Sequence, residues 1–453
     1  MGNKTDVVAG IGVHVQEVVN EERLYRKISL RIVPFLFLCY LVAYLDRINI
    51  GFLKLQMQDA LNFSDAVYGL GAGIFFLGYV LFEVPSNLLI GRLGARLTIG
   101  RVMLLWGIAA AGMSMVKTPM QFYACRFMLG VFEAGFVPGV LYYLSCWFPK
   151  KKRGVALSIF LAGSPIGGMI GGPISGTIMK QMNGVLSWGG WQWAFVVEAV
   201  PAIMLGVLAF LLLTDKVNDA KWLTKDERNR VIRDLETEKV QNGRKSSASA
   251  ADYLDKRIYF MTFAYFACIC GTYALAFWMP TMLKNIGVTN VEAIGWYVSI
   301  PFGFSAVAMY LLSKNSDRTG ERRLHTALCA VLGAVALVAI PFAPPTLTSA
   351  VVLMTLAAIG LFSTLPLFWA VPSDYLAGSP SAAPLMALIN SLGLLGGFFS
   401  PIAMGWIKQV TGSLVYGLYA TAALLVVGAI VLIFGVPKAD VQHNAVVRAE
   451  GSP

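Results

Sequence analysis

The chain has 453 residues, of which 57% are hydrophobic and only 13% are charged. A soluble domain carries about twice that share of charge, so most of this chain must face lipid or other apolar helices. Its net charge of +11 would suggest nucleic-acid binding in a soluble protein, but the sorting of charge across a membrane explains it better. We therefore expect a membrane protein that binds no nucleic acid.

A helix needs about 20 apolar residues to cross a bilayer, and twelve segments of the sequence meet that requirement. A polar stretch, residues 214–257, separates six of them from the other six. We predict an all-α integral membrane protein made of an N-terminal segment (1–30), two six-helix bundles (31–213 and 258–437), the central loop and a tail (438–453). The predicted spans are 31–52, 67–90, 97–117, 119–145, 154–179, 190–213, 258–283, 293–313, 324–342, 347–372, 382–407 and 412–436.

Lysine and arginine predict the orientation of these spans. If both termini are cytoplasmic, 29 of the 36 basic residues lie in the inside regions. Such an asymmetry is typical of cytoplasmic loops and supports an even number of spans. Five basic residues fall in the outside loops and two within spans: Lys54, Lys117, Lys180, Lys284 and Lys408 outside, and Arg47 and Arg126 within.

The two halves resemble each other at one loop. The chain reads "GRLGAR" (Gly91 to Arg96) after the second span and "DRTGER" (Asp317 to Arg322) after the eighth, with Arg, Gly and Arg in matching places. A duplicated six-helix bundle is typical of transporters that have a central cavity between their halves.

The loop "DRTGERR" resembles the signature of the major facilitator superfamily, Gly-x-x-x-Asp-Arg-x-Gly-Arg-Arg. The stretches "YLDRINIG", "FEVPSNLL" and "RFMLGVFEAGFVPG" are similar to the anion:cation symporter branch, which includes bacterial tartrate, phthalate and sugar-acid permeases. The resemblance covers roughly residues 25–437. It implies two pseudo-symmetric bundles in a bacterial inner membrane, around a central cavity lined by spans 1, 4, 7 and 10. It also implies gating by Arg92, Asp317 and Arg318, although Gly91 replaces the signature Asp in the first copy.

Four charged residues lie deep in the predicted spans, where each costs at least ~2.5–3.5 kcal/mol on insertion scales. Asp46 lies ~21 Å from the cytoplasmic side and Arg126 about 20 Å, at nearly the same level. Glu133 is two turns from Arg126 on the same helix face and ~10 Å closer to the cytoplasm. A structural ion pair, or a side chain that snorkels to the interface, is the alternative to a functional role. We expect Asp46 to face Arg126.

Arg47 follows Asp46 in the same helix and therefore points ~100° away from it. We expect it to face the cavity and bind a substrate carboxylate, because a guanidinium binds carboxylates in bidentate fashion and stays charged. The family pattern assigns the same role to an Arg in span 1. The three histidines lie in polar or loop positions, so proton coupling falls to Glu133 first and Asp46 second, with Arg126 tuning them.

Other polar residues within the spans have weaker assignments. Glu83, near Pro85, suits gating or helix capping, whereas Glu198 lies away from the expected cavity helices and is interpreted as structural. Aromatic and amide side chains elsewhere are candidate substrate contacts, although such residues often serve packing alone. The candidates are Tyr44, Asn49, Tyr79, Tyr273, Trp369 and Asn390.

The function predicted from these residues is proton-coupled symport of an organic anion by alternating access. We expect a monomer in contact with membrane lipid, with no metal and no cofactor other than the coupling proton. An exporter or antiporter of drugs or metabolites on the same fold is the first alternative. A transporter-like sensor is less favoured, and a membrane enzyme least, since no metal-ligand cluster or nucleophile–base pair is visible.

Overall fold

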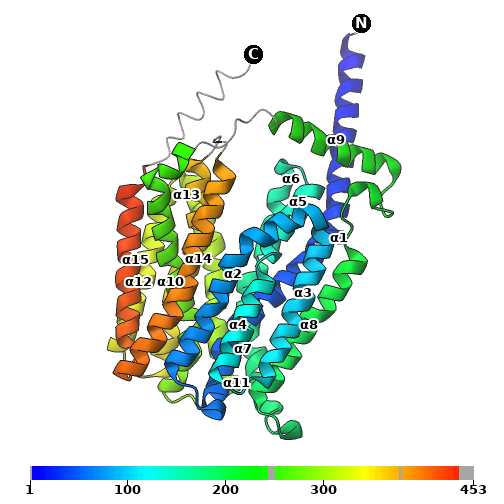
Figure 1. Ribbon diagram of the computed structural model, residues 1–453. Coiled ribbons are helices and arrows are strands. Elements are labelled where there is room, and N and C mark those ends of the chain that lie inside the picture. Colours follow the sequence, from blue (N-terminus) through cyan, green and yellow to red (C-terminus); the bar gives the residue numbers. More distant parts are fainter. Residues whose placement is uncertain (1–2, 243–249, 377–378, 380, 438–453) are drawn as a thin grey trace.

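The computed structural model describes residues 3–242, 250–376, 379 and 381–437, and all regular elements in that part are helices. Twelve helical segments are long and apolar enough to cross a membrane, which confirms the predicted number. The chain is thus an all-α, multi-pass membrane protein of two six-helix halves, which lie side by side in Figure 1. The predicted tail, 438–453, lies outside the described residues.

The N-terminal half contains the first six spans. Its helices are α1 (Asn3–Leu61), α2 (Asp65–Leu93), α3 (Ala95–Gly112), α4 (Pro119–Glu133), α5 (Phe136–Trp147), α6 (Lys150–Leu161), α7 (Gly163–Gln181) and α8 (Gly190–Leu212). Two spans are divided, the fourth into α4 and α5 and the fifth into α6 and α7. Two short 3-10 helices, η1 (Met113–Met115) and η2 (Val185–Ser187), lie in its loops.

The central segment carries η3 (Val217–Asp219), α9 (Lys225–Asn242) and η4 (Ala250–Leu254). The C-terminal half consists of undivided spans. Its helices are α10 (Lys256–Asn285), α11 (Val291–Thr319), α12 (Arg322–Ala339), α13 (Leu347–Tyr375), α14 (Ala382–Thr411) and α15 (Val415–Gly435), with η5 (Ile340–Phe342) between α12 and α13.

In Figure 1, α9 lies across the end of the molecule at which the chain begins. We call this end the α9 face and the other end the opposite face. The Tyr25 hydroxyl of α1 donates to Asp234 of α9 at 2.8 Å, and Lys27 forms an ion pair with Glu227 at 2.8 Å. Partial burial acts to raise the pKa of Glu227, but the bonds from Lys27 and Thr224 outweigh it, so the pKa lies below its ordinary value. The central segment is therefore bound to the N-terminal half.

Glycines bring the helix backbones close enough to lock the spans together. A Cβ added to Gly130 in α4 would overlap the backbone oxygen of Phe75 in α2. Between the halves, a Cβ on Gly172 in α7 would lie 2.6 Å from the backbone oxygen of Gly295 in α11. Close backbone approach through small residues is a common way for membrane helices to associate.

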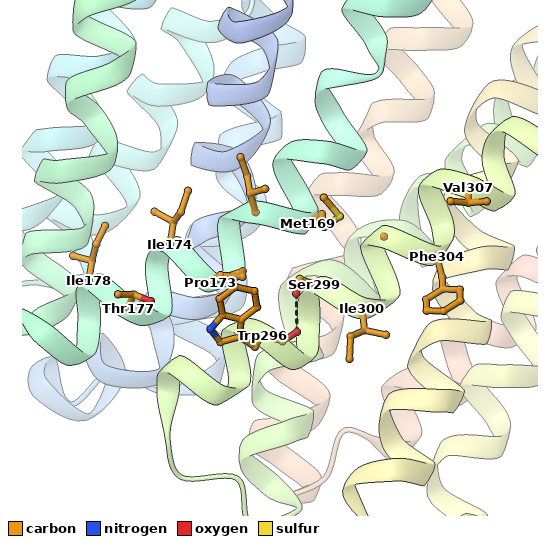
Figure 2. Close-up of a pocket in the computed structure, with 12 residues that line it drawn as sticks. Met169, Pro173, Ile174, Thr177, Ile178, Trp296, Ser299, Ile300, Phe304 and Val307 are labelled. Atoms are coloured by element: carbon orange, nitrogen blue, oxygen red, sulfur yellow. Dashed lines mark hydrogen bonds between the residues drawn. The ribbon is translucent and has the colours of Figure 1, made fainter.

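A groove of about 980 Å³ follows the seam between α7 and α11 (Figure 2). Its walls are almost entirely apolar, with Met169, Trp296 and Phe304 among the lining side chains. The Ser299 hydroxyl in the groove donates to the backbone oxygen of Trp296 in its own helix. Among the described residues, no charged side chain lines the groove.

The glycine contacts predict different effects on thermal stability for alanine substitutions at two positions. Gly130→Ala should lower the thermal midpoint of the purified protein by several degrees, because overpacking costs about 1–3 kcal/mol. Gly91→Ala is the matched control in α2, since nothing lies within 4 Å of its added Cβ. That change should leave the midpoint unchanged or raise it, because Ala favours a helix over Gly by about 0.5–1 kcal/mol. Equal midpoints for the two variants would contradict the packing described here.

Candidate functional site

Arg47 lies at the centre of the molecule and connects both halves. Its guanidinium forms an ion pair with Glu133 at the end of α4, in a short, charge-assisted contact. It also donates to the Tyr273 hydroxyl of α10 at 3.4 Å and lies over the rings of Phe75 and Tyr79, 5.5 and 5.4 Å from their centroids. The Arg47 side chain is 11% exposed. The carboxylate, the hydroxyl and the two aromatic faces together stabilise the enclosed cation.

The break between α4 and α5 follows directly after Glu133. Ala134 and Gly135 separate the two helices, and Gly135 packs so closely against Ser86 of α2 that a Cβ would displace the serine hydroxyl. One oxygen of the buried Glu133 carboxylate bonds Arg47, and the other has no hydrogen-bond partner. Interrupted helices at membrane depth are tolerated where the irregular backbone is enclosed by protein.

Asp46 does not pair with Arg126, so that prediction was wrong. Its carboxylate accepts from Trp106 Nε1 at 2.6 Å and from Asn49 Nδ2 at 3.3 Å. Arg126 is only 1% exposed; its Nε donates to the Gly71 backbone oxygen at 3.2 Å, and its Nη2 is buried without a partner. Within the described part of the chain, Arg126 forms no ion pair with a carboxylate.

Asn49 joins Asp46 to a second buried carboxylate. Its Nδ2 lies 2.7 Å from Glu198 Oε2 in α8, and Ser175 of α7 donates to Glu198 Oε1 at 2.6 Å. The sequence led us to interpret Glu198 as structural and gave no role to Ser175 or Trp106. Asp46 and Asn49 lie on α1, and Trp106, Ser175 and Glu198 lie on α3, α7 and α8, so only the tertiary structure reveals that they meet.

Glu83 holds the two halves together on the α9 side of Arg47. Asn390 and Ser391 of α14 donate to its two carboxylate oxygens, each at 2.8 Å. Asn390, predicted as a substrate contact, is thus occupied by a carboxylate of the protein itself. Glu83 lies 18 residues after the start of α2, about 27 Å along the helix, between the site and the α9 face.

The remaining predicted substrate contacts surround this centre or lie beyond it. Tyr44 and Tyr79 are buried, and Tyr79 touches Arg47 as described. Trp369 in α13 packs edge-to-face against Tyr265, with ring centroids 5.1 Å apart. The structure therefore brings Tyr79 and Tyr273 to Arg47, whereas Trp369 packs against Tyr265 and Phe368 instead.

The predicted gating loops do not pair across the halves. Asp317 bonds Arg322, five residues away in the same half, and Arg322 also lies 3.5 Å from Asp374. Arg92 and Arg318 are exposed and form no ion pair with any described residue. The loop that resembles the superfamily signature, "DRTGERR", thus forms ion pairs within the C-terminal half in this conformation.

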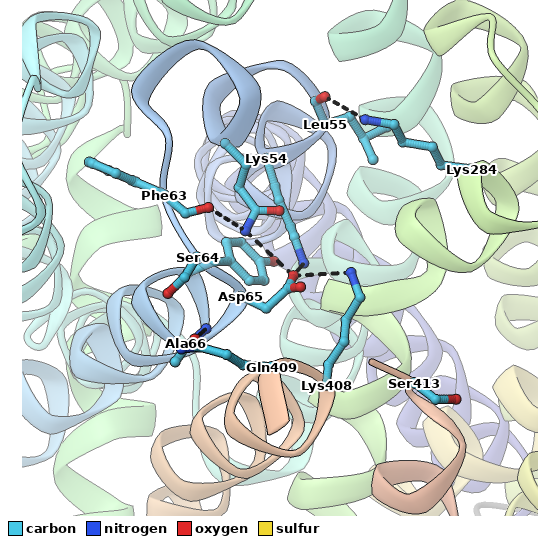
Figure 3. Close-up of polar contacts among 12 residues, drawn as sticks. Lys54, Leu55, Phe63, Ser64, Asp65, Ala66, Lys284, Lys408, Gln409 and Ser413 are labelled. Atoms are coloured by element: carbon cyan, nitrogen blue, oxygen red, sulfur yellow. Dashed lines mark hydrogen bonds and ion pairs between the residues drawn. The ribbon is translucent and has the colours of Figure 1, made fainter. Parts of the chain in front are cut away.

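A cluster of charges closes the opposite face, shown in Figure 3. Asp65, the first residue of α2, lies 3.1 Å from Lys54 of α1 and 3.1 Å from Lys408 of α14. Lys54 was predicted in an outside loop, but it belongs to α1 and is 1% exposed. Its ammonium lies over the rings of Trp278 (3.5 Å) and Tyr68 (4.1 Å). We call Lys54, Asp65 and Lys408 the Asp65 bridge.

Two further ion pairs cross between the halves at this face. Lys284 of α10 meets Asp59 of α1 at 3.1 Å, and Lys180 of α7 meets Glu292 of α11 at 2.6 Å. Both pairs are largely exposed, with Asp59 at 76%, so each contributes at most about 1 kcal/mol. The Asp65 bridge is more enclosed, with Lys54 1%, Lys408 17% and Asp65 22% exposed. It is therefore the dominant charged closure, because loss of Asp65 would leave the buried Lys54 uncompensated.

The fold and the buried charged centre are those of a membrane transporter. The Major Facilitator Superfamily model matches residues 36–401, and the chain belongs to that family.

A protein of Agrobacterium vitis named "Putative tartrate transporter" is 46% identical over 94% of this chain and 99% of its own length. The "Quinolone resistance transporter" of Acinetobacter baumannii is 36% identical over 95% of this chain and 99% of its own. A bacterial homolog of the human lysosomal transporter Spinster, in an inward-facing and occupied conformation, superposes with a TM-score of 0.73. The match covers 89% of this chain and 95% of the other chain. Their sequences are 17% identical, so the likeness concerns the fold alone.

Asp65→Asn should weaken the closure of the opposite face. The neutral amide no longer compensates Lys54 and Lys408, so the halves should separate there more often. Spin labels at Lys117 and Thr289, both exposed at this face, report the separation in a variant without the six native cysteines. We expect a new population of longer distances for Asp65→Asn and none for the exposed control Asp59→Asn. Identical distance distributions for the two variants would contradict a dominant role for the Asp65 bridge.

Proposed function

We propose that the protein is a proton-coupled symporter that imports a small organic anion across the bacterial inner membrane, with both termini in the cytoplasm. The tartrate transporter relative supports a carboxylate as substrate. The basic residues support the orientation: they are concentrated toward the α9 face, which would be cytoplasmic. Hydroxylated and aromatic acids would both suit one arginine with tyrosines beside it.

The ion pair between Arg47 and Glu133 carries this proposal. A guanidinium forms its strongest, bidentate contact with a single carboxylate, and the Arg47 guanidinium is already paired with the Glu133 carboxylate. A substrate carboxylate must therefore compete with Glu133 for Arg47. Protonation of Glu133 would weaken its hold and free the guanidinium, so that a proton and the anion bind together.

Contacts on both halves would couple binding to movement. A substrate held by Arg47 of α1 would also reach Tyr273 of α10, whose hydroxyl lies 3.4 Å from the guanidinium. Such a ligand favours the conformation in which the two halves approach around it. Release toward the cytoplasm would then require separation of Glu83 from Asn390 and Ser391.

The hydrogen-bonded group of Asp46, Asn49 and Glu198 offers a second place for a proton. Asp46 and Glu198 share one amide donor, Asn49, and no described cation forms an ion pair with either. A proton taken up by either carboxylate would relieve the repulsion between them. Arg126, buried and without a carboxylate partner, adds positive charge near both Asp46 and Glu133.

Arg47→Ala tests the substrate role. Loss of a charge-assisted bond of about 1.5–3 kcal/mol should weaken carboxylate binding by about 10- to 150-fold. A thermal-shift screen of carboxylates, with tartrate included, identifies the ligand, and calorimetry then compares the two proteins. Binding of unchanged affinity by the Arg47→Ala protein would refute anion recognition by Arg47.

Glu133→Gln tests the coupling role. The amide resembles the protonated acid, so binding should persist while accumulation driven by a pH gradient in proteoliposomes is lost. Glu236→Gln, an exposed change of the same chemistry on α9, is the control and should behave as wild type. Uptake that ignores both the pH gradient and the Glu133→Gln change would overturn proton symport.

Export of drugs is the second candidate function, and the quinolone resistance relative favours it. An exporter of cationic or neutral compounds has no need of a guanidinium in its site. Full transport of such compounds by the Arg47→Ala protein would therefore decide for the exporter.

A further inference from the structure

A stripe of basic residues runs along one face of α1 close to the α9 face. Arg23, Arg26, Lys27, Leu30 and Arg31 stand at i, i+3, i+4, i+7 and i+8, the spacing of a single helix face. Together with Leu212, the last residue of α8, they line a cavity of about 610 Å³. We call it the α1–α8 pocket. It is separate from the central site and from the α7–α11 groove.

The charges in the pocket are only partly compensated. Lys27 is paired with Glu227, and the guanidinium of Arg31 lies 5.5 Å from the ring centroid of Trp222. Arg23 and Arg26 are exposed and have neither an ion pair nor a hydrogen bond within the described part of the chain. Two free guanidinium groups therefore face the pocket, where they are available to an anion.

The pocket has apolar side chains beside its charged ones. Leu30 is 66% exposed and Leu212 is 47% exposed, and both line the pocket with the basic residues. Residues 23 to 31 span about 12 Å along the helix, whereas a headgroup layer is about 5–7 Å deep. The stripe is thus long enough to cross that layer and reach the start of the hydrocarbon.

From this arrangement we infer that the α1–α8 pocket binds an anionic phospholipid of the cytoplasmic leaflet. The lipid phosphate would bind Arg23 and Arg26, and an acyl chain would lie against Leu30 and Leu212. Basic pockets between membrane helices on the cytoplasmic side suit anionic headgroups. A soluble phosphate would use the arginines but not the leucines, so the exposed apolar wall favours a lipid.

Bound lipid would support the attachment of the central segment. Lys27 and Arg31 belong to the stripe and also contact Glu227 and Trp222 of that segment. Trp222 in turn stacks on Trp147 of α5, with ring centroids 5.4 Å apart. An anion at Arg23 and Arg26 would lower the repulsion among the four cations and so favour these contacts. The inference uses the proposed orientation of the chain but not its proposed substrate.

The test compares two double variants that remove equal charge. Arg23→Gln with Arg26→Gln alters the pocket, and Lys221→Gln with Lys225→Gln alters exposed lysines of the central segment as the control. Native mass spectrometry of each detergent-purified protein measures the affinity for phosphatidylglycerol and for phosphatidylcholine. We expect the pocket variant to bind phosphatidylglycerol about tenfold more weakly than wild type and the control to match wild type. Arg23→Lys with Arg26→Lys should restore most of the affinity.

Three outcomes would overturn the inference. The first is equal phosphatidylglycerol affinity in the pocket variant and the control. The second is equal affinity of the wild type for phosphatidylcholine, since the arginines would then confer no selectivity. The third is displacement of the lipid by millimolar inorganic phosphate, which would indicate a site for free anions. Lipid binding is measured without transport, so failure of the proposed symport would not affect the result.

Discussion

The buried ion pair between Arg47 and Glu133 is the interaction on which the rest of the site depends. A lone guanidinium at this depth would be costly, and Glu133, the last residue of α4, compensates it. Gly130, one turn earlier, lets α4 approach α2 closely enough for Phe75 and Tyr79 to enclose the cation. The Tyr273 contact then links the pair to the other half. Backbone packing, charge compensation and contact between the halves therefore meet at one side chain.

Polar contacts between the halves are distributed unevenly along the membrane normal. The opposite face has the Asp65 bridge and two exposed pairs, and the middle has Glu83 with Asn390 and Ser391. Toward the α9 face, the described residues include no ion pair between the halves. Since Lys54 is buried and Lys408 is only 17% exposed, opening of the opposite face must mainly overcome the Asp65 bridge.

Hydropathy and charge were sufficient to predict the twelve spans and the separation of Asp46 from Arg47. Depth counting could not choose their partners, because Arg126 and Glu133 share one face of the fourth span. Helix tilt and rotation decide which of them meets the first span, and neither is encoded in residue spacing. The hydrogen-bond partners of Glu198 could not be predicted for a related reason: Asn49 and Ser175 come from other helices. Lys54 looked like a loop residue because α1 continues beyond the predicted span.

The central claim is that the substrate and the proton bind together because Glu133 must release Arg47. Calorimetry of carboxylate binding in buffers of different ionisation enthalpy measures the number of protons taken up per ligand bound. The account predicts net proton uptake by the wild-type protein and less uptake by the Glu133→Gln protein. Binding without proton uptake, or with the same uptake in both proteins, would contradict it.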